Sequence, residues 1–174
     1  MLILDYRHKS FIILKFLIIL IACCILFSQL SIVSAAAPGY LNDMELSSLG
    51  FTSYEYINPN LLVYPLKRIN EKLKLKLLIN REQKREYAYK LYEIRLKELV
   101  YIVNNKKEGF LTLTADRYNS FVGILKTEFP VDEQSRSKFE SSIKLLERLR
   151  DIYPANSPNW DKLQQTVDTT RSLI

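Results

Sequence analysis

Apolar residues beyond position 60 recur every three or four positions, which is the spacing of one face of an amphipathic helix. The pattern predicts a first helix that begins between residues 60 and 64 and breaks near Asn80. Pro65 is compatible with this helix because proline is tolerated in a first turn. The apolar stripe of this helix consists of Leu62, Leu66, Ile69, Leu73 and Leu77.

The same spacing predicts a second helix from about Glu82 to Asn105, with a basic last turn and Gly109 as its closing glycine. A third helix is expected to start with Thr114 as the N-cap and to stop before Pro130. The apolar stripes of these two helices contain Ala88, Tyr92, Leu96, Leu99, Val103, Tyr118, Phe121, Val122 and Leu125.

A fourth helix is predicted to open at Asp132 and Glu133 and to end before Pro154. A short last helix should follow Ser157 and Pro158, since proline is favoured in a first turn behind a serine cap. No stretch shows sustained alternation with period two. The sequence therefore predicts an all-α fold of four to five amphipathic helices in an antiparallel bundle.

This helical domain is predicted to span residues 61–174, and residues 37–60 are predicted to be an extended, acidic leader or linker because they show no sustained period. We expect one core shared by all the helices. Its predicted members are Leu66, Ile69, Leu73, Leu91, Leu99, Phe121, Leu125, Ile143, Leu146 and Trp160.

The first 36 residues have the pattern of a targeting segment. Arg7 and Lys9 precede an apolar stretch over residues 11–33, and the small residues 34–37 follow it. This order is typical of a signal peptide, with cleavage after Ala35 or Ala36. The alternative is an uncleaved membrane anchor, because 23 residues form about 34 Å of helix at ~1.5 Å per residue. Polar residues within the stretch favour the signal peptide.

A third interpretation is lipidation of Cys23, which is disfavoured because the apolar core continues beyond that thiol. The signal-peptide and anchor interpretations both place the rest of the chain outside the cytoplasm, since positive residues before the apolar stretch stay inside. We therefore predict an exported protein that is periplasmic, extracellular or tethered to the outer face of the cytoplasmic membrane.

The residue inventory restricts the chemistry of the exported part. Both cysteines and His8, the only histidine, lie before residue 36. Disulfides, Cys or His metal sites and His-dependent nucleophiles are therefore excluded from residues 37–174. A carboxylate-dependent hydrolase is disfavoured, because most acidic residues lie on repeating polar faces beside Lys or Arg. We predict no catalytic residue, no cofactor, no metal and no small-molecule ligand.

Residues 59–99 contain two motifs that extend the picture of the first two helices. The segment from Tyr64 to Glu71 has the pattern Tyr-x-Leu-Lys-Arg-x-x-Glu, and Ala88 with the segment from Arg95 to Leu99 has the pattern Ala…Arg-Leu-x-Glu-Leu. In these motifs the chain resembles a family of exported bacterial all-α domains of unknown function, whose members also have a signal peptide and a Pro-containing leader. The junction proline of the family is absent here. The resemblance implies a fold and an exported location, and no site.

Charged residues of the first two helices are predicted to meet in a polar cluster. Its members are Lys67, Arg68, Glu71, Arg95 and Glu98. One hypothesis is a site for a small anion. The favoured hypothesis is a set of exposed or half-buried ion pairs that fix the register of the two helices.

The net charge of +6 comes from residues 64–108, where 13 Lys and Arg stand against 6 Glu. Interleaved lysines and tyrosines are typical of surfaces that bind polyanions, although a solvated helix face is the more common reason for them. The candidate polyanion-binding residues are Lys67, Arg68, Lys72, Lys76, Arg81 and Lys84, within a basic face over residues 67–97.

These observations favour a non-catalytic helical interaction or scaffold module at the bacterial cell envelope. Its partner would be another envelope protein or a second copy of the chain. The alternative is a module that binds a wall polymer, an anionic lipid surface or extracellular DNA through the basic face.

Overall fold

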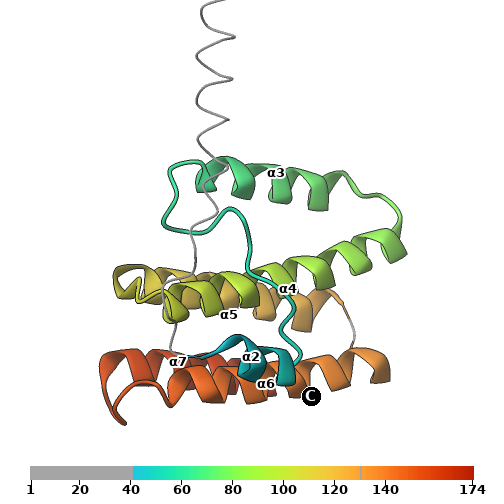
Figure 1. Ribbon diagram of the computed structural model, residues 1–174. Helices are drawn as coiled ribbons and strands as arrows, with labels where there is room; N and C mark the ends of the chain where they lie inside the picture. Colours follow the sequence, from blue (N-terminus) through green and yellow to red (C-terminus); the bar gives the residue numbers. More distant parts are fainter. Residues whose placement is uncertain (1–40, 130) are drawn as a thin grey trace, which may run out of the picture. The chain divides into compact units, whose positions relative to one another are not determined.

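The computed structural model describes residues 41–129 and 131–174, and every regular element within them is helical (Figure 1). The all-α prediction is therefore confirmed for this part of the chain. Its six α-helices and one 3-10 turn are α2 (Asp43–Ser48), α3 (Tyr64–Leu77), α4 (Arg81–Asn104), η2 (Glu108–Phe110), α5 (Leu111–Glu128), α6 (Glu133–Arg150) and α7 (Pro158–Arg171).

The predicted signal or anchor, residues 1–36, lies outside the described residues, as do residues 37–40 of the predicted leader. The chain divides into two units, residues 1–35 and residues 36–174, and the second contains all the helices described above.

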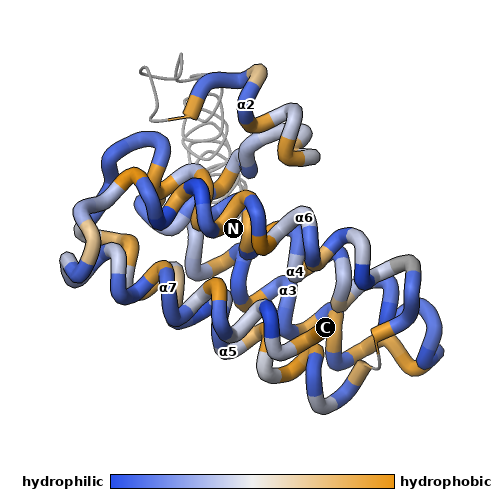
Figure 2. Tube along the Cα trace, turned by 90° about the horizontal axis from the view of Figure 1, so that it is seen from below, coloured by the Kyte–Doolittle hydropathy of each residue, from blue (hydrophilic) through white to orange (hydrophobic). Residues whose placement is uncertain are grey.

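The helices of the second unit are arranged in layers (Figure 1). α3 forms one edge, α4 and α5 lie in the middle, and α6 and α7 form the opposite edge together with α2. The main helix contacts join α4 to α5, α5 to α7 and α6 to α7, whereas α3 packs mainly on α4. Short hydrophobic and hydrophilic stretches follow one another along the helices, as Figure 2 shows.

The core lies between α4, α5, α6 and α7. Leu99, Val103, Leu125, Leu146 and Leu163 are fully buried in it. It also encloses a chain of hydroxyl groups: Tyr118 donates to the Tyr92 hydroxyl at 2.9 Å and lies 2.9 Å from the Thr170 hydroxyl. Six of the ten predicted core residues are buried, namely Leu91, Leu99, Phe121, Leu125, Ile143 and Leu146, and Trp160 packs against the core while half-buried.

Local capping signals position several helix ends as predicted. The side chain of Asp132 accepts a hydrogen bond from the Ser135 amide at 2.8 Å, and Ser157 caps α7 by accepting from the Trp160 amide at 3.3 Å. Thr114 is not an N-cap, because α5 already begins at Leu111 and the Thr114 hydroxyl bonds to the carbonyl four residues earlier. Gly109 does not close α4.

The residue that closes α4 is Lys106, which has a φ of +56°. Its amide donates to the Val103 carbonyl, and the Lys107 amide donates to the Ile102 carbonyl at 2.9 Å. This pattern is a Schellman motif, which normally favours glycine at the left-handed position. The lysine shows that hydrogen bonds and the following 3-10 turn can hold a residue with a Cβ in this conformation.

The described part of the predicted leader is structured and packed on the domain. Residues 43–48 form α2, and Leu41 and Leu46 are buried in the core. The Asn104 side chain accepts from the Leu41 amide at 2.9 Å and donates to the Leu41 carbonyl at 3.0 Å. Gly50, with a φ of +81°, ends α2 in a second Schellman motif. The segment is therefore part of the fold and not an extended linker.

Candidate functional site

Helix α3 has two opposite faces of different chemistry. At ~100° per residue, Tyr64, Glu71 and Leu75 lie on one side of the helix, and the predicted apolar stripe lies on the other. Tyr64 and Glu71 are buried, and Leu75 packs against the core. The side of α3 that faces α4 is therefore the mainly polar one.

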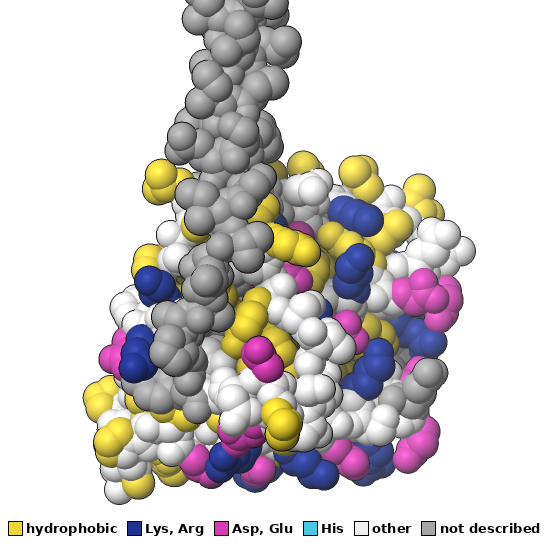
Figure 3. Space-filling model, viewed as in Figure 1, with side chains coloured by type: hydrophobic (Ala, Val, Ile, Leu, Met, Phe, Trp, Pro, Cys, Tyr) yellow, Lys and Arg dark blue, Asp and Glu magenta, His cyan; other side chains and the backbone are white. Residues whose placement is uncertain are grey.

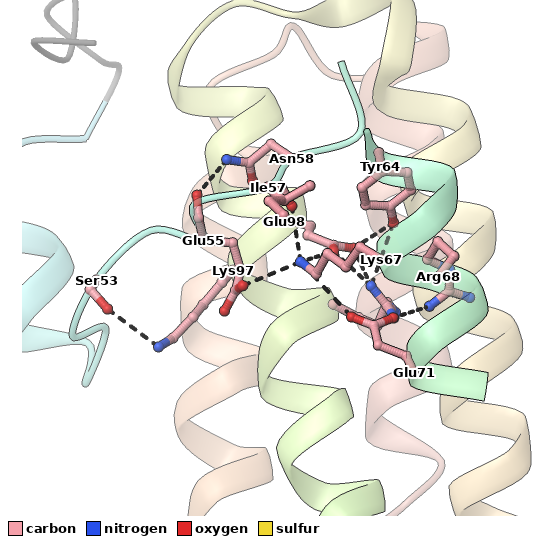
Figure 4. Close-up of polar contacts among 11 residues, drawn as sticks. Ser53, Glu55, Ile57, Asn58, Tyr64, Lys67, Arg68, Glu71, Lys97 and Glu98 are labelled. Carbon is pink, nitrogen blue, oxygen red and sulfur yellow. Dashed lines mark hydrogen bonds and ion pairs between the residues drawn. The ribbon is translucent and has the colours of Figure 1, made fainter. Parts of the chain in front are cut away.

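The polar side of α3 forms an ion-pair cluster with α4, which we call the α3–α4 cluster (Figure 4). Glu98 accepts hydrogen bonds from Lys67 at 2.8 Å, from the Tyr64 hydroxyl at 2.8 Å and from Arg95 at 2.6 Å. Glu71 is in contact with Arg95. It also accepts from Arg68 at 3.1 Å. The spacing of three and four residues on each helix brings these groups together.

Most of the α3–α4 cluster is hidden from water. Arg95 is 1% exposed, Glu98 is 0% exposed and Glu71 is 6% exposed. Burying charges is costly unless each is paired and hydrogen-bonded, and this arrangement meets that condition for Glu98. The prediction that these charged residues meet at the junction of the two helices is confirmed, whereas the expectation of exposed or half-buried pairs is wrong for these three residues, which form a buried network.

Burial also changes the ionisation of the cluster. Desolvation raises the pKa of Glu71 to about 7; the Lys67 ammonium opposes this shift, while Glu98 and Glu55 add to it. Desolvation and the neighbouring Glu98 carboxylate raise the pKa of Tyr64 well above its usual range, so Tyr64 stays protonated and acts as a donor. Glu71 is thus a buried carboxyl that gains or loses a proton near neutral pH.

The chain segment before α3 completes the cluster. Lys67 donates to the Ile57 carbonyl at 2.9 Å and pairs with Glu55 at 3.2 Å. The guanidinium of Arg117, from α5, lies 4.9 Å from the centre of the Tyr64 ring. Three cations, Lys67, Arg68 and Arg95, are matched by three carboxylates, Glu55, Glu71 and Glu98. Because each of these three cations is already paired with a carboxylate, the cluster does not favour a small-anion site.

The six candidate polyanion-binding residues do not form a single surface. Lys67 and Arg68 belong to the α3–α4 cluster, with side chains 12% and 22% exposed. Lys84 is half-buried and lies 4.0 Å from Glu128. The three that are exposed are Lys72, Lys76 and Arg81.

The tyrosines of the basic face lie at the edge of the core or within it, and Tyr92 was expected there as part of the predicted apolar stripe. Tyr92 is buried in the core, and Tyr87 and Tyr89 are half-buried. The Lys74 ammonium lies 4.6 Å from the centre of the Tyr87 ring. No stacking platform of three exposed rings is therefore formed by these residues.

The opposite side of α3 is an exposed apolar surface, which we call the α3 face and define as Leu66, Ile69, Leu73 and Leu77. The exposed fractions of these residues are 68%, 55%, 53% and 75%, respectively. In the space-filling view, hydrophobic side chains stand out along the edge that α3 forms, beside Lys and Arg side chains (Figure 3). The prediction that Leu66, Ile69 and Leu73 belong to the core is therefore wrong.

A separate cavity of about 370 Å³ lies between residues 49–52, α4 and α6. Its walls are mainly aromatic and aliphatic, and include Tyr89, Leu96 and Phe139. Glu93 is the carboxylate among its lining residues, and it pairs with Lys138 at 3.1 Å. This cavity does not bring two carboxylates to face each other, as the hydrolase hypothesis requires.

Among residues 41–129 and 131–174, no three or more His, Cys, Asp or Glu side chains are grouped so that they could hold a metal ion. None of the helices in these ranges combines the length and the apolar character needed to cross a membrane. No family model, curated protein or solved structure matches the chain.

Sequence reasoning missed three contributors to this site, namely Glu55, Tyr64 and Arg117. Tyr64 belongs to the polar side of α3 because it stands three residues before Lys67 and seven before Glu71, a spacing that could have identified it. Arg117 is 53 residues away from Tyr64 and carries no local signal of the contact.

Proposed function

We propose that the protein is a non-catalytic helical interaction module of the cell envelope that binds through the α3 face. The observation that supports this proposal is the orientation of α3, whose charged side is buried while its aliphatic side is exposed. Leaving four large aliphatic side chains in water on one helix is unfavourable, and such patches mark interaction surfaces in other proteins.

The remaining helices are proposed to act as the scaffold of this surface. Contacts of α4 with α5 and of α6 with α7 across short connections support an antiparallel bundle. The charged flank and small-residue run of the first 37 residues support export, with the domain either released or tethered to the outer face of the cytoplasmic membrane.

Site-specific photocross-linking tests the proposed binding surface. A photoreactive amino acid replaces Leu73 in the full chain produced in a bacterial host, and the matched control replaces Leu113, which is 49% exposed on α5. We expect adducts with protein or lipid at position 73 at several times the yield found at position 113. Equal yields at the two positions would overturn the proposal.

A further inference from the structure

The lysines around the α3 face determine what can cover it. Viewed along the helix at ~100° per residue, Lys72 and Lys74 lie on opposite flanks, between the buried side and the α3 face, and Lys76 lies at the edge of the α3 face. All three are exposed. The aliphatic stripe is therefore bordered on both sides by ammonium groups.

No exposed carboxylate of α3 offsets these charges. Glu71 is the only acidic residue between Tyr64 and Leu77, and it is buried in the α3–α4 cluster. The exposed surface of α3 is thus apolar in the middle and positive at its margins. Its partner must offer apolar groups and negative charge in the same place.

A second copy of the chain fits this surface poorly. Pairing two α3 faces would bring the lysines of one copy next to those of the other, which is unfavourable. The stripe from Leu66 to Leu77 is also only about 17 Å long at ~1.5 Å per residue. A strip of this length and one side chain wide is small beside the ~800 Å² per partner that a stable interface buries.

We propose that the α3 face docks on the surface of an anionic lipid bilayer. The aliphatic side chains enter the boundary between headgroups and acyl chains, and Lys72 and Lys76 extend to the lipid phosphates. Lys74 joins them when its ammonium leaves the Tyr87 ring, from whose centre it lies 4.6 Å away. Each such lysine strengthens binding roughly fivefold on an anionic surface. This inference rests on the proposed function, because it names the occupant of the same surface.

The beginning of the folded region supports a bilayer as the occupant. The predicted apolar segment ends near Val33, and the chain is held on the domain from Leu41 onward. The eight residue steps from Val33 to Leu41 span at most about 29 Å at ~3.6 Å per residue. If the segment is the uncleaved anchor, it would hold the domain this close to the membrane.

Depth-dependent fluorescence quenching tests the inference on the full chain in lipid nanodiscs. Cys23 and Cys24 are replaced by alanine, and an environment-sensitive dye is attached to a cysteine that replaces Leu73. The control label replaces Gln165, an exposed residue of α7, the helix that Figure 1 shows at the edge opposite α3. The discs contain either phosphatidylcholine alone or phosphatidylcholine with about a third phosphatidylglycerol, and lipids with a nitroxide on the acyl chain serve as the quencher.

We expect the dye at position 73 to be quenched in the discs that contain phosphatidylglycerol, and the dye at position 165 not to be. The variant Lys72→Gln/Lys74→Gln/Lys76→Gln should lose most of this quenching, since its docking equilibrium weakens by more than tenfold. The matched variant Lys107→Gln/Lys126→Gln/Lys144→Gln removes the same charge from exposed positions elsewhere and should keep it.

Equal quenching at positions 73 and 165 would overturn the inference, and so would equal quenching of position 73 in both kinds of disc. If position 73 is shielded from aqueous iodide but not quenched from the lipid, its occupant is a protein. That result would overturn the lipid inference and leave the proposed function intact.

Discussion

Helix α3 and the group α4–α7 differ in which side of an amphipathic helix they bury. In α4–α7 the apolar stripes face inward, and residues such as Leu99, Leu125 and Leu146 are fully buried. In α3 the polar side faces inward, where Glu71 meets Arg95, and the aliphatic side faces water. Amphipathic character alone therefore does not determine which side of a helix is buried. The chemistry of the neighbouring helix decides it.

This difference also separates the two regions energetically. Packed aliphatic groups stabilise α4–α7 without depending on pH, whereas α3 is held by charges whose attraction must offset their desolvation. A helix attached in this way leaves its apolar side available for a partner. The two regions should consequently respond differently to mutation and to pH.

The largest effect is expected from removing a carboxylate of the α3–α4 cluster. Glu98→Ala should lower the free energy of unfolding by about 3–5 kcal/mol, because it leaves Arg95 buried with one carboxylate fewer. Urea denaturation followed by circular dichroism measures this change. The control Glu93→Ala removes a 48% exposed partner of Lys138 and should change stability by less than about 1 kcal/mol. Similar losses for both variants would mean that the α3–α4 cluster is hydrated in solution.

Two leucine truncations compare the regions directly. Leu146→Ala removes a fully buried side chain of α6 and should reduce the free energy of unfolding by about 2–5 kcal/mol. Leu73→Ala removes a side chain that is 53% exposed on α3 and should reduce it by less than about 1 kcal/mol. Thermal melts of both variants test this order. If Leu73→Ala cost as much as Leu146→Ala, the α3 face would be covered within the folded chain.

The third prediction concerns pH. The folded state raises the pKa of Glu71 from 4.5 to about 7, so between these values the folded chain binds the proton more tightly than the unfolded chain does. Stability from this group is therefore greatest below pH 4.5 and decreases as the pH rises to about 7, by on the order of 2–3 kcal/mol. The charged groups that surround Glu71 are Lys67, Arg68, Arg95, Glu98 and Glu55.

Denaturation of the wild type and of Glu71→Gln at a series of pH values isolates this contribution. The difference in unfolding free energy between the two proteins should change over the window from pH 4.5 to 7 and level off above it. A difference that is constant throughout the window would show that Glu71 does not titrate there.

The smallest effect is expected at the helix starts, where α3 and α7 again differ. Ser157 caps α7 through the Trp160 amide, whereas Val63 precedes α3 without a capping side chain. Ser157→Ala should cost about 1 kcal/mol, and Val63→Ala should stay within about 0.5 kcal/mol. Chemical denaturation measures the change in the free energy of unfolding for each variant. Equal changes would mean that the Ser157 cap contributes nothing to stability.

Local signals in the sequence were sufficient for most of the helices. The Ser157-Pro158 pair predicted the first residue of α7, and Asp132 with Glu133 predicted the first turn of α6. The long stripe through Leu99 predicted α4 to within about a residue at each end. These features depend on residues a few positions apart, which is why a pattern in one sequence identifies them.

The inward side of α3 depends on residues that are distant in the chain. Arg95 and Glu98 lie 24 to 34 residues beyond their partners Glu71 and Tyr64, and only the packed α4 brings them together. The expectation that the apolar side of a helix faces the core therefore placed the wrong side of α3 in the interior. α2 was missed because its six residues are too few to show a helical period.

The hydrogen bonds of Asn104 determine how a pulling force would enter this domain. The side chain holds both the amide and the carbonyl of Leu41, and donates to the Tyr54 hydroxyl at 2.7 Å. A pulling force on the chain before Leu41 would load the two hydrogen bonds between Leu41 and Asn104 at the same time. Both bonds would therefore share the force that reaches the end of α4. Residues 41–63 would lengthen a tether only in steps, because the buried Leu46 and the Glu55–Lys67 pair would still hold the segment after the Leu41 bonds had broken.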